Sequence, residues 1–398
     1  MLKFLDIKGD RVIWGVVILL SIASLVAVYS STGMLAFQEK GGNTEYYLIK
    51  HFFILLIGLG LIYATHKIKY HKFSRISIIA YIISIPLLII LMVAGKNHNE
   101  AVRSLEIPII HLSFQPFDVA KLSLILFIAH LLTNAETYFQ SVQKAFYPIL
   151  IIVSIICGLI FPSNFSTSAL LFLICLIMMY IGGINWKKIA LILGIGLGLV
   201  ALIYLMGDSL PDWGRLKTIQ SRIESHIHPD KANNKDELFQ AEQSRIAIAT
   251  GGVFGKMPGN GTQKNILPYP YSDFIYAIII EEFGLVGGGF LLLMYLILIY
   301  RGVRIATKCP YNFGAIAAFG ISLALVIQAI VNMGVTVSIF PVTGQNLPLV
   351  SMGGTSVWFT CISIGIMLSI SKEIEPPIES TLENSEEIEP NDTEYATA

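Results

Sequence analysis

Long runs of apolar residues with few charged positions recur along the chain, from near its start to residue 370. About ten of them are long enough to cross a hydrocarbon layer of about 30 Å as a helix. These predicted spans are residues 12–34, 49–66, 75–94, 117–134, 146–162, 167–183, 188–206, 273–299, 312–340 and 346–370. The runs are too long and too continuously apolar for barrel strands, so the pattern predicts an all-α polytopic membrane protein.

Three longer regions lie outside the predicted spans. Residues 95–116 contain the apolar stretch EIPIIHLSF and are expected to form a re-entrant or interfacial segment. Residues 207–272 form a long loop between the seventh and eighth spans, and such loops in compact domains are usually functional. Residues 373–398 contain nine acidic and no basic residues, which is typical of a disordered tail. We therefore expect a single membrane domain over residues 1–372, followed by this tail.

The distribution of lysine and arginine predicts the orientation in the membrane. If both termini are cytoplasmic, the inner loops and ends contain fourteen of these residues and the short outer loops contain three. Short basic loops remain on the cytoplasmic side of a membrane. The sequence therefore predicts that both termini are cytoplasmic and that residues 207–272 are extracytoplasmic.

Composition agrees with the hydropathy pattern. The 398 residues are 54% hydrophobic and 14% charged, with a mean hydropathy of +0.69, which excludes an ordinary soluble protein. The formal net charge is zero, so no nucleic-acid partner is expected. Four cysteines, at positions 157, 175, 309 and 361, show no metal-ligand spacing and predict no disulfide framework. No metal site is assigned from the sequence.

One stretch changes from a proline-broken loop to an apolar helix, with the sequence ILPYPYSDFIYAIIIEEFGLVGGG at residues 266–289. Asp273 lies at this transition, at the outer face of the predicted topology. It can serve as the N-cap of the helix, because a carboxylate is stabilised at the positive end of the helix dipole. It can also serve as a general base positioned by the rigid loop, and the two roles are compatible.

Two adjacent carboxylates, Glu281 and Glu282, follow in the same apolar run. A continuous helix would place them about 12 Å below Asp273, toward the inner half of the membrane, at 1.5 Å per residue. Charged groups at that depth are costly, so each is expected to pair with a base. Lys121, in the fourth predicted span, is a candidate partner. Asp118 lies three residues before Lys121 on the same helix face and is an alternative partner for it.

Four motifs, in the same order along the chain, resemble those of the shape, elongation, division and sporulation (SEDS) family, which includes FtsW and RodA. The run YSDFIYAIIIEEFGLVG at 271–287 is similar to the family signature T-D-F-I-F-A-x-x-x-E-E-x-G-L-x-G. QPFDVAKL at 115–122 is similar to Q-P-S-E-x-A-K-L, and residues 243–268 resemble the outer-loop block. NMGVTVSIFPVTGQNLPLVSMGGTS at 332–356 resembles the last motif.

The resemblance implies a peptidoglycan glycosyltransferase that polymerises lipid II, a disaccharide-pentapeptide on undecaprenyl diphosphate, at the outer face of the plasma membrane. It implies that Asp273 is the catalytic base that deprotonates the acceptor sugar hydroxyl. Candidate contacts to the diphosphate or sugar are Arg103, Lys121, Gln243, Ser244, Lys256 and Gln263. Structural or coupling roles are expected for Asp118, Glu281, Glu282, Asn332 and Ser351. A divalent cation, Mg or Mn, is a further possibility.

The resemblance also implies partners, namely a class B penicillin-binding protein and the divisome. The wording of the 271–287 motif and the GGNTEYY of the first outer loop are similar to FtsW of the Bacteroidetes type, which favours septal synthesis in cell division. A RodA-like elongation polymerase, a lipid II flippase and a non-catalytic scaffold are the alternatives. Three positions depart from the family pattern: Ser104 follows Arg103, Asp118 replaces a glutamate, and Asn164 replaces an aspartate.

Overall fold

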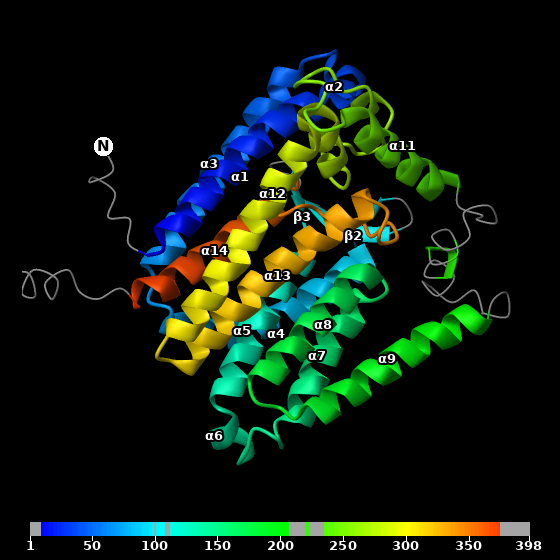
Figure 1. Ribbon diagram of the computed structural model, residues 1–398. Helices are drawn as coiled ribbons and strands as arrows, with labels where there is room; N and C mark the ends of the chain where they lie inside the picture. Colours follow the sequence, from blue (N-terminus) through cyan, green and yellow to red (C-terminus); the bar gives the residue numbers. More distant parts are fainter. Residues whose placement is uncertain are drawn as a thin grey trace, which may run out of the picture.

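The computed structural model describes residues 9–94, 96–98, 101–107, 112–206, 220–222, 224 and 235–374. Most of these residues are helical (Figure 1). The helices are α1 (Arg11–Ser31), α2 (Gly33–Lys40), α3 (Thr44–Lys67), α4 (His71–Ala94), α5 (Pro116–Thr133), α6 (Ala135–Phe139), α7 (Phe146–Ile160), α8 (Phe165–Ile181), α9 (Trp186–Met206), α11 (Lys235–Gly251), the 3-10 helix η4 (Gln263–Asn265), α12 (Ile275–Lys308), α13 (Asn312–Thr336) and α14 (Thr355–Lys372).

The predicted polytopic helical membrane fold is confirmed. Each predicted span falls wholly or partly on one of these helices. Seven of them, α1, α3, α4, α5, α12, α13 and α14, are long and apolar enough to cross a membrane, and α7 and α8 are shorter apolar helices. In Figure 1, α9 leans away from the bundle, and most of its side chains are exposed. The predicted acidic tail lies outside the described residues, apart from residues 373 and 374.

The bundle has two distinct ends, which two contacts of α1 define. At one end Asp10, the N-cap of α1, forms an ion pair with Arg301 of α12, with 2.6 Å between Oδ2 and Nε. At the other end the Ser30 hydroxyl donates to the Glu282 carboxylate. Following the predicted topology, we name the first the inner end and the second the outer end. The helices α2, η4 and α11 pack at the outer end, where α2 and α11 are labelled in Figure 1. The helix α1 therefore runs antiparallel to the C-terminal part of α12.

A small antiparallel sheet, which the sequence did not predict, precedes α5. Its strands are β1 (Lys96–His98), β2 (Ala101–Ile107) and β3 (Leu112–Phe114), in the order β1-β2-β3. The segment expected to be re-entrant or interfacial thus contains a small sheet, and its depth relative to a membrane stays a prediction. In the described part of this region the short strands pair with one another, so the paired backbone groups are satisfied without a helix.

The last predicted span, 346–370, does not begin as a helix. Residues 337–354 form an irregular loop, and α14 begins only at Thr355. The Val350 carbonyl accepts a hydrogen bond from Ser24 of α1 at 2.8 Å, which places the loop about 10 Å inward of Ser31 at 1.5 Å per residue. Irregular backbone at such depth is tolerated where it lines a cavity, and this loop does so.

A sharp break divides α12 at Gly284, whose φ of +69° and ψ of −171° are essentially restricted to glycine. The Tyr276 hydroxyl donates to the Gly288 carbonyl at 3.2 Å, although residues twelve apart on a straight helix are about 18 Å apart. The segment before Gly284 therefore folds back toward the segment after it. Loop backbone closes the break, since Leu285 N donates to the Gly252 carbonyl at 3.0 Å.

Candidate active site

A polar cavity of about 350 Å³ lies among α5, α8, α13 and the loops that precede α12 and α14. Its lining combines residues that are far apart in the sequence, because the two loops dip between the helices. The polar side chains that line it belong to Gln115, Asp118, Lys121, Asn164, Thr167, Ser272, Asp273, Gln328, Gln345, Asn346 and Ser356. Asp273 and Lys121, the two residues with the most specific predicted roles, therefore share one cavity.

Asp273 lies in a turn, and the backbone of this turn is bound by its neighbours at three successive carbonyl groups. The carbonyls of Tyr271, Ser272 and Asp273 accept hydrogen bonds from Met352 N at 2.9 Å, Ser351 Oγ at 2.7 Å and Asn332 Nδ2 at 2.9 Å. The α12 helix begins at Ile275 with Phe274 as its N-cap, and no side chain caps it. The N-cap interpretation of Asp273 is therefore wrong, and its half-buried side chain lines the cavity instead.

Polar side chains also surround the Asp273 carboxylate. The Ser272 hydroxyl lies 3.1 Å from Asp273 Oδ1 and 2.9 Å from Asn346 Oδ1. The amide of Asn332 binds both the Asp273 carbonyl and the Gln345 carbonyl, the latter at 2.6 Å. Asn332 and Ser351 therefore each bind the backbone of the turn that contains Asp273.

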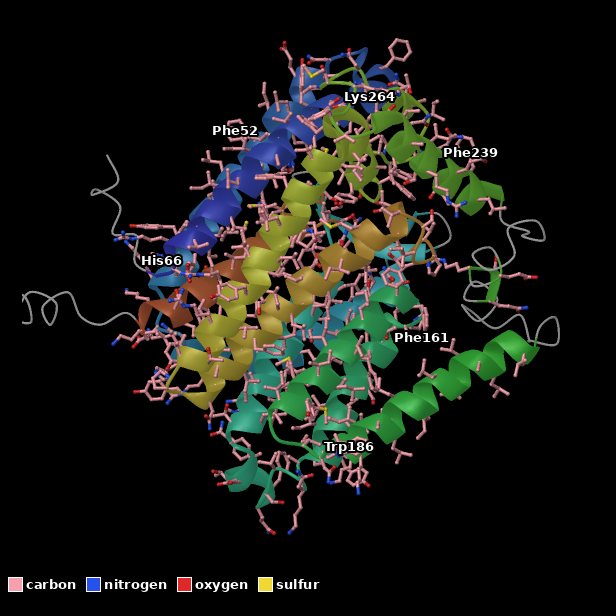
Figure 2. The ribbon with its side chains drawn as sticks, viewed as in Figure 1. Phe52, His66, Phe161, Trp186, Phe239 and Lys264 are labelled. Carbon is pink, nitrogen blue, oxygen red and sulfur yellow. The ribbon has the colours of Figure 1, made fainter. Side chains whose placement is uncertain are left out.

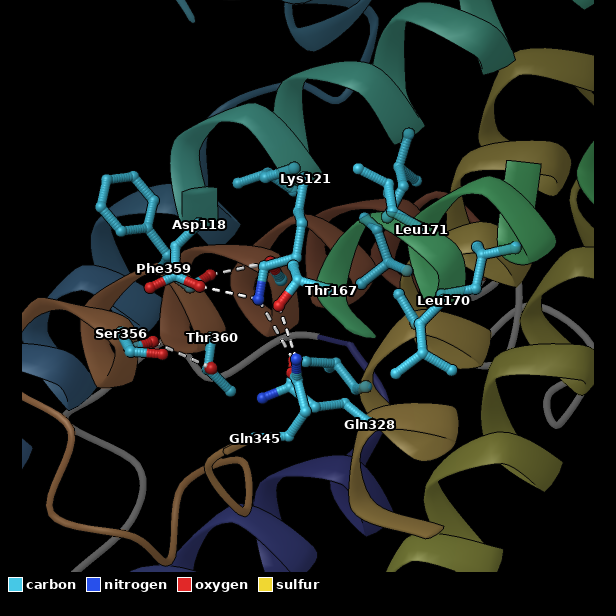
Figure 3. Close-up of a pocket in the computed structure, with 17 residues that line it drawn as sticks. Asp118, Lys121, Thr167, Leu170, Leu171, Gln328, Gln345, Ser356, Phe359 and Thr360 are labelled. Atoms are coloured by element: carbon cyan, nitrogen blue, oxygen red, sulfur yellow. Dashed lines mark hydrogen bonds and ion pairs between the residues drawn. The ribbon is translucent and has the colours of Figure 1, made fainter. Parts of the chain in front are cut away.

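Lys121 lies about one turn into α5 and also lines the cavity. Its ammonium is 2.7 Å from Asp118 Oδ1 and 3.3 Å from Gln328 Oε1 (Figure 3). The pair is therefore Asp118–Lys121, and neither of the deep glutamates binds Lys121. Asp118 Oδ2 is buried and has no hydrogen-bond partner among the described residues. The Lys121 side chain is 23% exposed, so an anion in the cavity can reach it.

A second, mostly apolar pocket adjoins the polar cavity beside Lys121 (Figure 3). The two share Asp118, Lys121, Thr167, Gln328, Gln345 and Ser356 on their linings. Below these residues the lining is aliphatic and aromatic, with Ile125, Leu171, Ile174, Leu325 and Phe359. The Asp118–Lys121 pair therefore lies at the boundary between a polar cavity and an apolar pocket.

Asn164 and Gln345 are cavity residues that the sequence did not assign to the site. Asn164 is the N-cap of α8, where its side chain accepts from Thr167 N at 3.0 Å. Gln345 Nε2 donates to Thr167 Oγ1 at 2.5 Å. In the sequence PSNFST at residues 162–167, Asn164 replaces the aspartate of the family pattern, and this departure was the available signal for a site residue. Gln345 is part of a motif whose loop conformation only the structure reveals.

Glu281 and Glu282 are not in the inner half of the bundle, which corrects the expectation from a continuous helix. Both are buried, with 0% and 1% exposed area, beside the outer end of α1. Figure 2 shows Lys264, which pairs with Glu282 at 3.3 Å, beside α2 and far from the inner end. The reason is the break at Gly284, which makes the chain rise from Asp273 to the glutamates before it descends again.

Four further predicted substrate contacts do not line the cavity. Lys256 Nζ pairs with Glu281 at 2.9 Å, and the same carboxylate accepts from the backbone N–H of Gln263 at 3.1 Å. Ser244 is fully buried and donates to the Thr336 carbonyl at 2.8 Å. Gln243 is next to it on α11 and is half-buried. These residues fasten the outer loop to the bundle rather than forming a single site with Asp273.

Arg103 lies on β2, but its side chain is outside the described part of the structure. Among the described residues no group of three His, Cys, Asp or Glu side chains is placed to hold a metal ion. The carboxylates on the described cavity lining are Asp118 and Asp273. Mg²⁺ is usually held by one or two carboxylates together with substrate phosphates. The cavity therefore fits a cation that arrives with a diphosphate better than a resident one.

Residues 10–375 match the model of the cell cycle protein family of FtsW, RodA and SpoVE. The chain belongs to this family. The predicted resemblance to the SEDS family is thereby confirmed, and the family model spans the whole described bundle.

Several relatives align along most of this family member. It is 32% identical over 382 residues to the probable peptidoglycan glycosyltransferase FtsW of Bacillus subtilis (strain 168), covering 93% of this chain and 92% of the relative. It is 30% identical over 362 residues to stage V sporulation protein E of the same organism, covering 90% and 95%. A probable peptidoglycan glycosyltransferase FtsW of Geobacter sp. (strain M18) is 29% identical over 366 residues, covering 91% and 96%.

Two solved structures share the fold. A chain of a peptidoglycan synthase complex that coordinates polymerization and crosslinking has a TM-score of 0.70 at 22% identity, covering 93% of this chain and 99% of that one. The rod shape determining protein RodA of Thermus thermophilus has a TM-score of 0.65 at 20% identity, covering 93% and 98%. At these identities the comparison establishes the architecture alone.

Proposed function

We propose that this family member is a peptidoglycan glycosyltransferase that polymerises lipid II at the outer side of the bacterial plasma membrane. The names of its relatives support the activity. The observation that carries the proposal is the cavity whose lining includes both a carboxylate, Asp273, and a lysine, Lys121. One group suits proton removal from an acceptor hydroxyl, and the other suits an anionic leaving group.

Asp273 is the general base in this proposal. Its carboxylate accepts the proton of the acceptor sugar hydroxyl, whose oxygen bonds to the anomeric carbon of the donor as the bond to the lipid diphosphate breaks. A positioned base of this kind contributes about 10²- to 10⁴-fold to the rate. Lys121 stabilises the charge on the departing diphosphate, and the lipid chains leave toward the surrounding bilayer.

Purified protein incubated with labelled lipid II tests the proposal, with and without a class B penicillin-binding protein. We expect polymer from the unmodified chain and at least a 100-fold slower reaction from Asp273→Ala, by the size of a general-base effect. Ser77→Ala is the matched control, because the buried Ser77 hydroxyl binds only the Ser74 carbonyl of its own helix, at 2.8 Å. Undiminished polymer from Asp273→Ala would refute the role of the base. Transport of lipid II across liposomes without any polymer would support a flippase instead.

We further propose that the protein acts at the division septum, with divisome proteins and a class B penicillin-binding protein as partners and with both termini in the cytoplasm. The FtsW relatives and the fourteen-to-three charge distribution support this assignment. Depletion of the protein from its own cells distinguishes the two biological roles. Filamentous cells are expected for division, whereas rounded cells would indicate elongation.

A further inference from the structure

The Asp273 carboxylate is held by more than its backbone, because a chain of side-chain contacts runs from it across the cavity. Ser272 Oγ lies 3.1 Å from Asp273 Oδ1 and 2.9 Å from the side-chain amide of Asn346. The Asn346 carbonyl accepts from Gln328 Nε2 at 2.8 Å, and Gln328 Oε1 accepts from Lys121 Nζ at 3.3 Å. Five residues from four separate segments thus connect the proposed base to the proposed anion-binding lysine.

The chemistry of these groups fixes the direction of the hydrogen bonds near Asp273. A serine hydroxyl has one hydrogen, so Ser272 cannot donate to both Asp273 and Asn346. An ionised carboxylate only accepts, so the Ser272 hydrogen is directed to Asp273. Asn346 can then bind Ser272 only by turning its NH₂ group toward the Ser272 oxygen. The oxygen and nitrogen of an amide are assigned from such contacts, so this orientation is the one that satisfies all three residues.

We propose that Ser272 and Asn346 are positioning residues of the glycosyl transfer. Asn346 donates to Ser272, and Ser272 donates to the Asp273 carboxylate, which fixes the rotamer of the base toward the cavity. The inference rests on the proposed role of Asp273 and adds two residues to that site. Gln328 links this hydrogen-bonded chain to Lys121, because it donates to the backbone carbonyl of Asn346 and accepts from the Lys121 ammonium.

The backbone contacts explain why such a device is needed. The three carbonyl contacts at residues 271–273 locate the backbone of the turn and do not act on the Asp273 carboxylate. A base is effective when it is within hydrogen-bond reach of the hydroxyl it deprotonates, and a displacement of about 1 Å can cost about 100-fold in rate. The Ser272 hydroxyl lies 3.1 Å from Asp273 Oδ1, close enough to orient this carboxylate.

Single-turnover and steady-state polymerisation by the full-length protein in detergent or liposomes tests the proposal. We expect Ser272→Ala to lower kcat by about 10- to 100-fold, the range for losing a hydrogen bond to a charged group, with KM for lipid II changed less than about threefold. Ser272→Thr keeps the hydroxyl and should restore kcat to within about threefold of the original. A merely structural defect would not be rescued selectively by the residue that retains the hydroxyl.

Asn346→Asp is the sharper variant, because it keeps the shape, removes the donor and offers the Ser272 hydroxyl a charged acceptor that competes with Asp273. It should lower kcat about as much as Ser272→Ala does. With Asn346→Ala as a further single variant, the double variant Ser272→Ala/Asn346→Ala should be no slower than the slower of its two single variants, because the two residues act in series. Ser77→Ala again provides the control for loss of a buried hydroxyl, and melting temperatures of all variants show whether they fold.

The outcomes separate this inference from the proposed function. If Asp273→Ala retains full activity, the role of the base fails and the positioning role fails with it. If Asp273→Ala is inactive while folded Ser272→Ala and Asn346→Asp keep their kcat, only the positioning inference is overturned. A fall in kcat that Ser272→Thr does not restore also contradicts the positioning inference. So does a double variant whose fall in kcat is the product of the falls of its two single variants.

Discussion

At the scale of residues, the structure shows which partners the charged cavity residues Lys121 and Asp273 have, whereas the sequence shows only that these residues are present. Lys121 is paired with Asp118 on its own helix, so it is held in place before any substrate arrives. Asp273 Oδ1 lies 3.1 Å from the neutral hydroxyl of Ser272, which can hold a carboxylate in place while it accepts a proton. The spacing of Asp118 and Lys121 predicted their contact, because residues three apart share a helix face. Apart from the adjacent Ser272, the residues that hold the turn at Asp273 come from α13 and from the loop before α14, so local spacing could not reveal them.

Lys121→Met tests the anion-binding role. We expect KM for lipid II to rise about tenfold or more, because a hydrogen bond from a charged donor contributes about 1.5–3 kcal/mol. Steady-state polymerisation measures this change. Asp118→Asn/Lys121→Met is the companion variant, since it removes the unpaired buried charge that Lys121→Met alone leaves behind. An unchanged KM in both folded variants would exclude Lys121 from substrate binding.

At the scale of elements, the break in α12 decides where the acids lie. The loop that follows α11 crosses the break at Gly252 and Val253, and a Cβ at Gly284 would meet the Val253 carbonyl. On the outer side of the break, Glu281 accepts hydrogen bonds from Lys256, the Thr262 backbone and the Gln263 backbone. These contacts fasten the outer loop above the segment that carries the base. The sequence EEFG indicated a glycine but not its conformation, since glycines also occur inside membrane helices.

Gly284→Ala should therefore loosen the outer loop. The positive φ alone costs an alanine about 1–3 kcal/mol, and the clash with the loop backbone adds to this. We expect a lower melting temperature and faster proteolysis of the 252–265 loop. Gly289→Ala is the matched control, because a Cβ at Gly289 meets nothing within 4 Å. Equal stability of the two variants would argue against a tight fold-back.

At the scale of the whole molecule, the two ends of the bundle carry different chemistry. The inner end is closed by the Asp10–Arg301 ion pair, and the outer end by the buried glutamates with Lys256 and Lys264. The cavity opens between these ends, where the irregular loop before α14 replaces helix. A substrate with a polar head and a membrane-bound chain can therefore meet the charged pair at the border of a polar and an apolar compartment.

Cysteine labelling tests this orientation in cells. In a Cys309→Ser background, Phe254→Cys on the exposed outer loop should react with a membrane-impermeant maleimide from outside. Lys72→Cys, at the exposed start of α4, should react only after the membrane is permeabilised. The reverse pattern would contradict the predicted topology and place the cavity on the cytoplasmic side.

The sequence by itself determined the class of fold, most of the spans and the family. Hydropathy decides these features because every backbone polar group in a bilayer must be satisfied within its own segment. The tertiary structure alone decided the depth of Glu281 and Glu282, the loop that replaces the start of the last span, and the neighbours of Asp273. Those features depend on one glycine conformation and on hydrogen bonds between segments more than 50 residues apart. Contacts of that range leave no periodic trace in the chain, so they appear only once the helices are packed.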